Sequence, residues 1–588
     1  MSGNVYPIDL PNTISNYNAG ATITPAGRLM HLSGIPGITT NGLVPDDHES
    51  QIHLSLLTFR RLIIAAGAST SDIAKLTVYV KNYDPKNPKH RRQLSRFVGT
   101  HRPAMMLVLV PSLFGDEWTF EIDATVSADV IILGATVSGL YAAREAKKAG
   151  LTCIVLDAAG RLGGVDTHSV ALSETCATDV ATGWINGGES KIYALAKSFG
   201  AEFIDEPKGG NIVYQDANGK TYSYPFGSVP YDVSSAEGKQ LGEIVKCIEA
   251  ELTDMDIWNV SNPALDAYTM EAWLRSKGAS GSTLDIGNLW ARALFGMEAR
   301  DVSALWFLQY LKSFNGLALI GSSRSNAGPR FRLRKGADVI VNGLAASLPE
   351  GSIRLNCPIE AVVQPDGQPV QVKAAGVVYS GRKVISTVSS QVLKKITFQP
   401  RLPDNKQTWI DSAIANHYSK VVMEFETPFW AEKGFCGLAE SAIGPATVIQ
   451  NASIPSDNKH LILGFMAGDP GVEFFRQSEK EQKKKFLAQL STVFGVDDLE
   501  QNFVQMWTSE WHKDPSTGGC ALTGLPPGVV DQIGGDALRK PFQSIHFSGI
   551  ETAVVYQGYL EGAVLAAERA FAEVSQAIEV DRKAEGVL

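Results

Sequence analysis

Short apolar runs alternate along the chain with stretches whose apolar residues recur at helical spacing. In the clearest succession, the apolar run 130–133 is short enough for a buried parallel strand, and a glycine-containing turn follows it. A helical stretch over 140–148 ends before Gly150, a residue suited to a helix C-terminal cap. A second apolar run, 153–156, leads directly into Asp157. The pattern predicts a strand–helix–strand unit with a carboxylate at the tip of its second strand.

The turn and this carboxylate together are typical of a dinucleotide-binding site. The turn contains Gly134, Thr136, Ser138 and Gly139, and a helix N-terminus offers unpaired N–H groups and a positive dipole end to a pyrophosphate. Asp157 follows Gly134 by 23 residues, close to the interval at which an acidic residue binds ribose hydroxyls. Thr136 replaces the middle glycine of G-x-G-x-x-G, so its side chain would either crowd the pyrophosphate or give it a hydrogen bond. The alternative is an ordinary α/β turn.

Further patterns lie on both sides of this unit. Strand-like runs and helical stretches alternate over residues 1–126, which predicts a small α+β domain. Residues 234–315 are mostly helical in pattern, and their clearest helix begins at Asp301, the N-cap candidate. A strand, a glycine turn and a helix recur over 544–574. We therefore expect an α/β fold with a Rossmann-type nucleotide-binding domain, preceded by the small α+β domain.

Composition narrows the class of protein. At 588 residues with 44% hydrophobic and 20% charged residues, the chain is long enough for several globular domains. Its net charge of −9 argues against nucleic acid and against an anionic membrane surface as partners. The 6 cysteines form no C-x-x-C pair, so no metal site or disulfide framework is predicted. Since no signal peptide and no apolar run of ~18 residues occurs, we expect a soluble cytoplasmic protein.

Residues 1–126 carry a set of short motifs: Leu32-Ser33-Gly34, Gln51, Ala65-Ala66-Gly67-Ala68-Ser69, the run from Asp72 to Tyr79, Pro103-Ala104 and Glu121-Ile122-Asp123-Ala124. In these motifs the segment resembles the Rid (YjgF-type) family, which has a chorismate-mutase-like α+β fold. The resemblance implies a homo-oligomer, because members are trimers with pockets between subunits, and many hydrolyse enamines and imines. Met105 replaces the arginine that holds a carboxylate in those enzymes. An assembly or stability module is therefore the favoured interpretation over a hydrolase.

Four blocks follow in order: 129–165 with Arg161-Leu162-Gly163-Gly164; 301–312; 418–430; and 511–520 with Gly549-Ile550-Glu551-Thr552 and 559–562. In these blocks residues 129–575 resemble the flavin-containing amine oxidases of the monoamine oxidase type. The resemblance implies FAD as cofactor. It also implies a Rossmann-type FAD-binding domain at 127–203, 334–408 and 514–588 that is interwoven with an α+β substrate-binding domain at 204–333 and 409–513, after the Rid-like domain at 1–126.

The resemblance also implies roles for individual residues. Lys420 matches the lysine that positions a water at the flavin N5, and Tyr559 matches one wall of the aromatic pair that flanks the amine. Asp157 would hold the adenosine ribose, Ile359 would lie near the adenine, and Trp511 would pack against the isoalloxazine. The remaining implied FAD contacts are Gly134, Thr136, Ser138, Gly139, Ala158, Arg161, Gly163, Gly164, Thr182, Gly183, Trp184, Cys520, Gly549, Glu551 and Thr552.

Three positions decide how far the resemblance extends. Cys520 follows two glycines at the place where animal monoamine oxidases attach FAD covalently through sulfur, although a cysteine is also a common small buried residue. Val165 replaces the arginine of the family's Gly-Gly-Arg. Ala521 replaces the tyrosine that completes the aromatic pair, so that wall of the substrate pocket would admit a longer or bulkier amine.

The order of the two domains resembles the fungal aminopolyol amine oxidases, which deaminate hydrolysed fumonisin, a long-chain polyol amine. We therefore expect an FAD-dependent oxidase of long or bulky aliphatic primary amines. Hydride would pass from the amine to flavin N5, water would hydrolyse the imine to aldehyde and ammonia, and O₂ would yield H₂O₂. The partners would be the small-molecule amine and O₂.

Two alternatives stay open. The first is a non-catalytic assembly protein whose flavin site has decayed, which Thr136, Val165 and Ala521 motivate. The second is an oxidase of amino acids or polyamines. An amino-acid substrate would need a carboxylate-binding arginine, for which the run 330–334 offers three candidates, and a polyamine would favour acidic walls.

Overall fold

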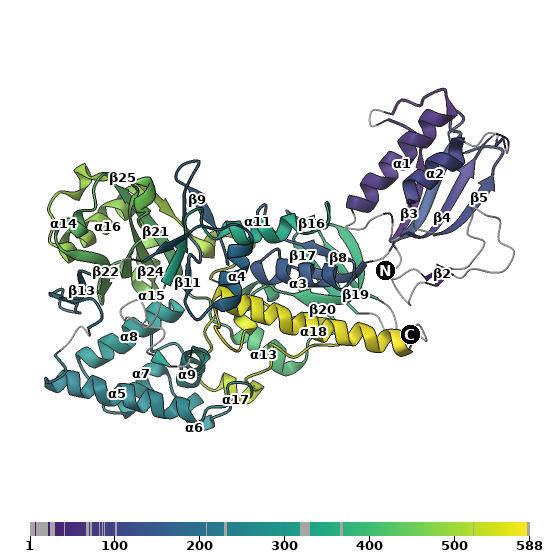
Figure 1. Ribbon diagram of the computed structural model, residues 1–588. Helices are drawn as coiled ribbons and strands as arrows, with labels where there is room; N and C mark the ends of the chain where they lie inside the picture. Colours follow the sequence, from purple (N-terminus) through teal and green to yellow (C-terminus); the bar gives the residue numbers. More distant parts are fainter. Residues whose placement is uncertain are drawn as a thin grey trace.

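The computed structural model describes most of the chain from Met30 to Ala584, together with Tyr6–Pro7 and Thr22–Ile23 (Figure 1). Ala521 lies outside the described residues, so the predicted gap in the aromatic pair stays a prediction. The residues left out are 1–5, 8–21, 24–29, 40–41, 66–69, 71–72, 82, 85, 87–88, 100–102, 114, 127, 207–208, 229–231, 315, 318–329, 365–368, 521 and 585–588.

The N-terminal unit is a sheet packed by two helices, α1 (His48–Ala65) and α2 (Lys89–Val98) (Figure 1). In spatial order its strands are β3 (Met30–Pro36), β6 (Phe120–Val126), β4 (Ile73–Val80) and β5 (Ala104–Leu109). Ile52 and Phe59 of α1 bury against Leu76 and Val78 of β4. Gln51 ties α1 to the loop before β6, because its amide donates to the Glu117 carbonyl at 3.0 Å and accepts from the Thr119 N–H at 2.8 Å. The separate pair β1 (Tyr6–Pro7) and β2 (Thr22–Ile23) is antiparallel.

The predicted strand–helix–strand unit lies in the centre of a second sheet. Its strands, in spatial order, are β16 (Ile353–Arg354), β8 (Cys153–Leu156), β7 (Ala128–Leu133), β19 (Val377–Ser386), β18 (Val370–Ala374), β17 (Ile359–Val363) and β20 (Thr397–Gln399), and β26 (Ile545–Phe547) pairs with β19. From β16 to β19, and at β26, the strands are parallel. The continuous apolar run of β7 is fully buried, as expected for a parallel strand covered on both faces.

Helices α3 (Val137–Lys148) and α18 (Leu560–Ala584) lie side by side on one face of this sheet, with α11 (Asp338–Ala346) next to α3 (Figure 1). Small buried residues of α3, among them Ala142 and Ala146, allow this close packing. Helix α18 extends to Ala584, beyond the predicted end at residue 574. The mixed α/β fold class is confirmed.

A third sheet has seven strands. In order they are β14 (Thr221–Pro225), β13 (Asn211–Gln215), β22 (Phe435–Ser441), β23 (Ala446–Asn451), β24 (His460–Ala467), β21 (Tyr418–Phe425) and β25 (Phe503–Thr508). Helices α14 (Phe429–Glu432), α15 (Gly468–Phe475) and α16 (Glu479–Phe494) bury apolar residues against it. Lys480, Lys484 and Lys485 are exposed on α16, as the charge pattern predicts for a solvated helix face.

The middle of the chain forms the helical layer that the sequence predicts. Its helices are α5 (Ala236–Thr253), α6 (Pro263–Asp266), α7 (Met270–Ser276), α8 (Ser282–Phe295) and α9 (Ala304–Ser313). The predicted cap of α9 is wrong: Ser303 accepts the Trp306 N–H with its hydroxyl at 3.3 Å, whereas Asp301 is exposed. Trp306 and Phe307 are fully buried in the core.

Smaller elements connect these layers. A three-stranded sheet has the order β11 (Trp184–Asn186), β15 (Arg330–Leu333) and β12 (Phe203–Asp205), and β9 (Ser169–Ala171) pairs with β10 (Ala177–Asp179). Within the described residues, the remaining helices are α4 (Ser190–Ser198), α12 (Ser390–Leu393), α13 (Asp404–Ser412) and α17 (Val529–Ile533), with short 3₁₀ turns at Pro455–Asp457, Leu499–Gln501, Trp511–Lys513 and Ile550–Thr552.

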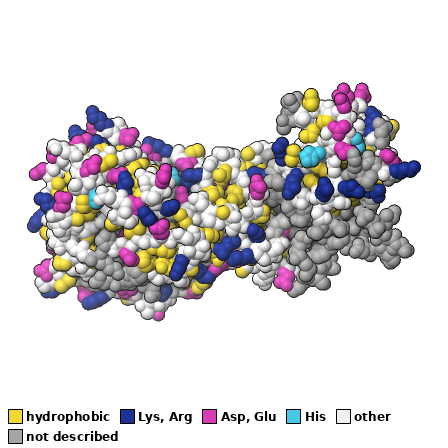
Figure 2. Space-filling view, turned by 45° about the horizontal axis from the view of Figure 1, so that its top comes forward, with side chains coloured by type: hydrophobic (Ala, Val, Ile, Leu, Met, Phe, Trp, Pro, Cys, Tyr) yellow, Lys and Arg dark blue, Asp and Glu magenta, His cyan; other side chains and the backbone are white. Residues whose placement is uncertain are grey.

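Cationic and anionic side chains intermingle over the face that Figure 2 shows. Within the described ranges, every helix is too short or too polar to cross a bilayer. Strand β6 ends at Val126 and β7 begins at Ala128, which is where the first domain junction is expected. The full discontinuous division into domains stays a prediction.

Candidate active site

Two adjoining cavities contain most of the residues predicted for the site. The larger has a volume of about 490 Å³ and the smaller about 250 Å³. Val165 and Ile550 line both, so the cavities are neighbours across these two side chains. The smaller cavity is lined by the predicted residues Gly134, Thr136, Asp157, Ala158, Gly164, Ile359, Gly549 and Glu551. The larger cavity is lined by the predicted residues Thr182, Gly183, Trp184, Lys420, Trp511, Cys520 and Tyr559.

The turn between β7 and α3 requires glycine at both ends. Gly134 has a φ of +104°, and a Cβ there would lie 2.4 Å from Thr387 Oγ1. A Cβ on Gly139 would lie 2.0 Å from the Gly134 carbonyl oxygen. Only glycine therefore allows the tight turn that starts α3 directly at the wall of the smaller cavity.

Thr136, the residue in place of the middle glycine, is the N-cap of α3. Its hydroxyl accepts the Gly139 N–H at 3.1 Å and donates to Thr387 Oγ1 at 3.0 Å. The hydroxyl proton is therefore engaged within the protein. The structure thus gives Thr136 a capping role that neither sequence alternative includes.

Asp157 lies at the tip of β8, as the pattern predicts. Its carboxylate accepts the Ala135 N–H at 2.6 Å and the Ala159 N–H at 2.7 Å, one bond to each oxygen. Burial raises the pKa of Asp157, and these two N–H groups oppose that shift because they stabilise the ionised form. The carboxylate is thereby fixed in the wall of the smaller cavity, and its further lone pairs suit ribose hydroxyls.

Asp166 is a further carboxylate in this cavity, and the sequence analysis did not predict it. The side chain is buried at the N-terminus of α3, where Oδ2 accepts the Val137 N–H at 3.2 Å. Burial raises the pKa of Asp166 to about 7. The available signal was its place directly after Val165, the residue that replaces the family's phosphate-side arginine.

One row of side chains across the seven-stranded sheet forms the floor of the larger cavity. Strand register places Lys420 opposite Phe465, Phe465 opposite Val448, Val448 opposite Glu440 and Glu440 opposite Tyr214. All five line the cavity. Because neighbouring strands are ~4.8 Å apart, the four steps of this row span ~19 Å. The cavity is therefore long in the direction that leads away from Lys420.

Lys420 is a buried cation at one end of this row. Its Nζ donates a short hydrogen bond to the Ala181 carbonyl and lies 4.8 Å from the centroid of the Trp184 ring. Burial lowers the pKa of Lys420, and attraction by the buried carboxylate of Asp179 opposes that shift. Burial in turn raises the pKa of Asp179. Lys420 is therefore a buried residue of the cavity wall and not a surface lysine.

Aromatic hydroxyls gather beside the lysine. Tyr559 is hydrogen-bonded to Tyr310, and burial raises the pKa of Tyr559 to about 12, so it is neutral at physiological pH. The Tyr559 ring packs edge-on against Phe314, with centroids 4.5 Å apart. Tyr418 donates its hydroxyl to the Ala293 carbonyl at 2.9 Å. Tyr310 thus belongs to the cavity as well as to the core, a role that its helical spacing did not reveal.

Several predicted FAD contacts line neither cavity: Ser138, Gly139, Arg161, Gly163 and Thr552. Arg161 donates to the carbonyls of the glycine loop and lies 5.4 Å from the Trp511 ring, so it orders the loop and supports that tryptophan. The hydroxyls of Ser138 and Ser548 are 2.6 Å apart. Glu551 lines the smaller cavity, but its carboxylate is already bonded to Ser390 and Thr523. Direct contact between these residues and FAD stays a prediction.

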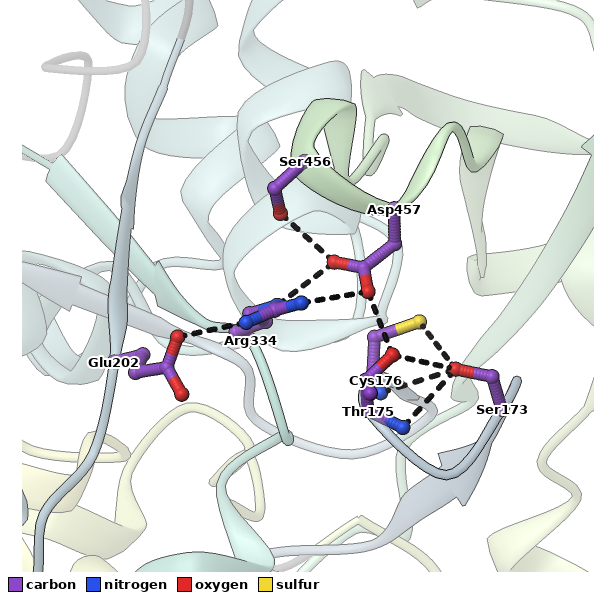
Figure 3. Close-up of polar contacts among 7 residues, drawn as sticks. All are labelled: Ser173, Thr175, Cys176, Glu202, Arg334, Ser456 and Asp457. Carbon is purple, nitrogen blue, oxygen red and sulfur yellow. Dashed lines mark hydrogen bonds and ion pairs between the residues drawn. The ribbon is translucent and has the colours of Figure 1, made fainter.

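The three arginines at 330, 332 and 334 have separate environments. Arg334 pairs with Asp457 at 2.7 Å and Glu202 at 2.9 Å, within the network drawn in Figure 3. Arg332 is buried and donates to the Ala452 carbonyl at 2.8 Å. Both tie β15 to the turn after β23, and only Arg330 of the three lines the larger cavity.

Comparison with known proteins identifies the class of this site. The family model described as "Flavin containing amine oxidoreductase" matches residues 137–575. The chain belongs to this family. The model described as "Endoribonuclease L-PSP" matches residues 8–128, which confirms the Rid-type domain ahead of the amine oxidase.

Among curated relatives, "Amine oxidase [flavin-containing] B" of Canis lupus familiaris is 28% identical to this chain over 456 residues, which cover 76% of this chain and 86% of that protein. The Homo sapiens protein of the same name is 26% identical over the same shares. Among solved structures, cyclohexylamine oxidase from Brevibacterium oxydans IH-35A superimposes with a TM-score of 0.71 at 24% identity, covering 77% of this chain and 99% of that one. Putrescine oxidase bound to putrescine gives 0.70 at 23%, covering 76% and 99%. These structures support the fold.

Membership in the family implies FAD, and the two adjoining cavities fit it. The smaller cavity offers a helix N-terminus and the Asp157 carboxylate, which suit a pyrophosphate and a ribose. The larger cavity offers Trp511 and the Lys420 ammonium, which suit a planar ring and its developing charge. Asp166 fits beside a pyrophosphate only in its protonated form.

Proposed function

We propose that this amine oxidase is an FAD-dependent oxidase of primary amines with a long aliphatic chain. The observation that carries the proposal is the row from Lys420 to Tyr214, which extends the cavity ~19 Å away from the buried cation. A short amine would leave most of that length unfilled. An aminopolyol of the fumonisin type has the required length.

The walls of the cavity support an aliphatic chain. Helix α8 contributes Leu289, Trp290 and Leu294, and α5 contributes Leu241 and Val245. Burying the methylene groups of a substrate against such side chains stabilises the complex by ~0.8 kcal/mol per CH₂. A long chain therefore gains affinity that a short amine lacks.

FAD, when bound, supplies the two-electron oxidation by which RCH₂NH₂, O₂ and H₂O become RCHO, NH₃ and H₂O₂. The protein's part is binding and orientation. The aromatic faces of Tyr559 and Tyr418 would hold the amine in its neutral form, because neither hydroxyl is ionised near neutral pH. Lys420 would hold a water in the buried space next to Trp184.

The test is amine-dependent turnover of the purified holoenzyme. We expect anaerobic octylamine to bleach the flavin absorbance, and octylamine in air to yield one H₂O₂ and one ammonia per aldehyde. Values of kcat/KM should rise from butylamine to decylamine as more methylene groups are buried. Flavin that is not bleached by any amine would instead support the non-catalytic alternative.

We also propose a covalent bond between FAD and Cys520. Gly518 and Gly519 adopt positive φ angles, and the resulting turn brings Cys520 to the wall of the larger cavity near Trp511. After acid precipitation we expect the yellow colour to stay in the pellet, and Cys520→Ala to release it to the supernatant. Colour in the wild-type supernatant would mean that FAD is bound without this bond and that Cys520 is a packing residue.

The Rid-type domain is proposed to assemble copies of the chain. β5 is an edge strand of the described four-stranded sheet, and its Met106 and Leu109 side chains are 52% and 60% exposed. Apolar side chains on a sheet edge are suited to contact another subunit. Light scattering should give a mass that is a multiple of 63.3 kDa, and Leu109→Asp should reduce it.

A further inference from the structure

Arg330 brings a guanidinium into the larger cavity, and the proposed reaction gives it no role. It is the first residue of β15, and its side chain is 17% exposed. Its Cζ lies 4.9 Å from the centroid of the Trp184 ring, and its Nη1 is 3.3 Å from Glu206 Oε2. Two fixed contacts therefore hold the guanidinium in place at the cavity wall.

The distances of Arg330 and Lys420 from the Trp184 ring show how near Arg330 lies to the reacting end of the cavity. Lys420 Nζ lies 4.8 Å from the same ring centroid, so Arg330 Cζ and Lys420 Nζ are at most 9.7 Å apart (4.8 + 4.9). The charge of Arg330 also lowers the pKa values of Lys420 and Tyr559. Arg330 therefore lies in the same part of the cavity as Lys420 and Tyr559, where the first carbons of a bound amine would pass.

The neighbours of Arg330 leave donors available for a ligand. Within the described ranges, the Arg330 side chain has one hydrogen-bond acceptor, the Glu206 carboxylate, to which its Nη1 donates. The other oxygen of Glu206 accepts the Trp184 Nε1–H in a short hydrogen bond. A guanidinium has five N–H donors and no acceptor, so Nε and Nη2 can still donate.

Three ligand chemistries can be compared at this position. An ammonium has no lone pair for these donors and is repelled by the cation. A carboxylate would meet the Glu206 carboxylate, which already balances the arginine's charge. A neutral oxygen substituent accepts the N–H groups without adding charge, so it matches the local balance best.

We propose that Arg330 is a specificity-determining residue that binds a hydroxyl group on the carbon chain of the amine substrate. This inference rests on the proposed oxidation of long-chain amines and assigns to one side chain of the cavity the recognition of a hydroxyl on that chain. The enzyme then recognises hydroxylated amines by the hydroxyl at Arg330, and the apolar walls bind the remaining chain.

The experiment compares octylamine with 1-aminooctanols that carry one hydroxyl on carbon 2, 3, 4 or 5, using the holoenzyme. The readout is the ratio of kcat/KM for each aminooctanol to that for octylamine, taken within each variant. We expect at least one aminooctanol to exceed octylamine in the wild type, and Arg330→Met to lower that ratio about 10-fold or more, the effect of losing a hydrogen bond from a charged donor. Arg330→Gln, which keeps a donor, should lower it less.

Arg334→Met is the matched control, because Arg334 lies on the same segment but pairs with Asp457 and Glu202 outside the cavity lining (Figure 3). Its ratio should equal that of the wild type. Glu206→Gln leaves the guanidinium charge unbalanced, so it should raise the rate with 2-aminooctanoate relative to octylamine.

An Arg330→Met variant that keeps every wild-type ratio would overturn the proposal. A wild type that prefers 2-aminooctanoate over all aminooctanols, with the preference lost in Arg330→Met, would overturn it in favour of a carboxylate site. If octylamine is not oxidised, the proposed function fails separately. The dissociation constants of the same amines, measured from the change in the flavin spectrum, then decide the role of Arg330.

Discussion

Replacing Lys420 by Met should slow the reoxidation of the reduced flavin by O₂ by about 100-fold or more, the loss typical when one preorganised electrostatic group is removed from a buried site. The side chain is buried, and its ammonium lies against the Ala181 carbonyl and the Trp184 ring. O₂ reduction builds negative charge in this water-poor space. A fixed cation stabilises that charge strongly because the local dielectric is low.

The pH dependence should distinguish charge from packing. Burial lowers the pKa of Lys420, so its protonated fraction falls at lower pH than for an exposed lysine. Reoxidation by the wild type should therefore slow as the pH rises and the ammonium loses its proton. The Lys420→Met variant has no proton to lose there, so its slow rate should not change with pH.

Stopped-flow mixing of the amine-reduced enzyme with O₂ measures this step apart from amine oxidation. Lys406→Met is the matched control. Lys406 is also a buried lysine whose pKa burial lowers to about 7, but it donates to the Ala537 and Leu538 carbonyls and lines neither cavity. Its loss should reduce thermal stability and leave the reoxidation rate unchanged. Equal reoxidation rates in wild type and Lys420→Met would refute the role of the cation.

Local signals in the sequence predicted the nucleotide-binding unit well. One strand–helix–strand segment contains the turn from Gly134 to Gly139, the cap at Gly150 and the acid at Asp157. The pattern of neighbouring residues is therefore sufficient to predict all three. The cap of α9 shows the limit of such signals. Asp301 and Ser303 are both good N-cap residues, and only the hydrogen bond to the Trp306 N–H selects Ser303.

The residues that line the cavities could not be predicted from local patterns in the same way. Phe465 faces Lys420 because β24 pairs with β21, and the register of that pairing is set by contacts across the whole sheet. Arg330, Arg332 and Arg334 are equivalent candidates in the sequence. Only the folded structure shows that Arg332 and Arg334 bind protein partners, which leaves Arg330 as the arginine that lines the cavity. Asp166 could not be predicted from local pattern, because only the folded loop brings its side chain back to the Val137 N–H at the start of α3.

Asp166 leads to the second large expected effect: the affinity for FAD should fall as the pH rises above about 7. Its carboxyl lies at the N-terminus of α3, where a helix offers its N–H groups to an anion. Ionised, it would face the pyrophosphate, and two like charges about 4 Å apart repel by about 4 kcal/mol at an effective dielectric constant of ~20. Protonated, it can donate a hydrogen bond to a phosphate oxygen.

The groups around Asp166 determine whether the affinity for FAD rises or falls with pH. Burial raises the pKa of Asp166, the Val137 N–H and Arg161 oppose that rise, and Asp157 adds to it, so that the pKa lies at about 7. A bound pyrophosphate adds negative charge and raises this pKa again. Binding therefore takes up a proton above about pH 7, and affinity falls by up to tenfold per pH unit there. At pH 9 it should be about 100-fold weaker than at pH 6, whereas Asp166→Asn should bind equally well at both.

Titration of apoprotein with FAD, followed by flavin fluorescence from pH 6 to 9, gives these affinities. Cys520→Ala serves as the background so that a covalent bond does not obscure the equilibrium. Glu189→Gln is the control, because burial also raises the pKa of Glu189 to about 7 but this carboxyl lines neither cavity. It should keep the pH dependence of the background. A dependence that survives in Asp166→Asn would assign the proton to another group, and no dependence at all would mean that Asp166 turns away from the pyrophosphate when FAD binds.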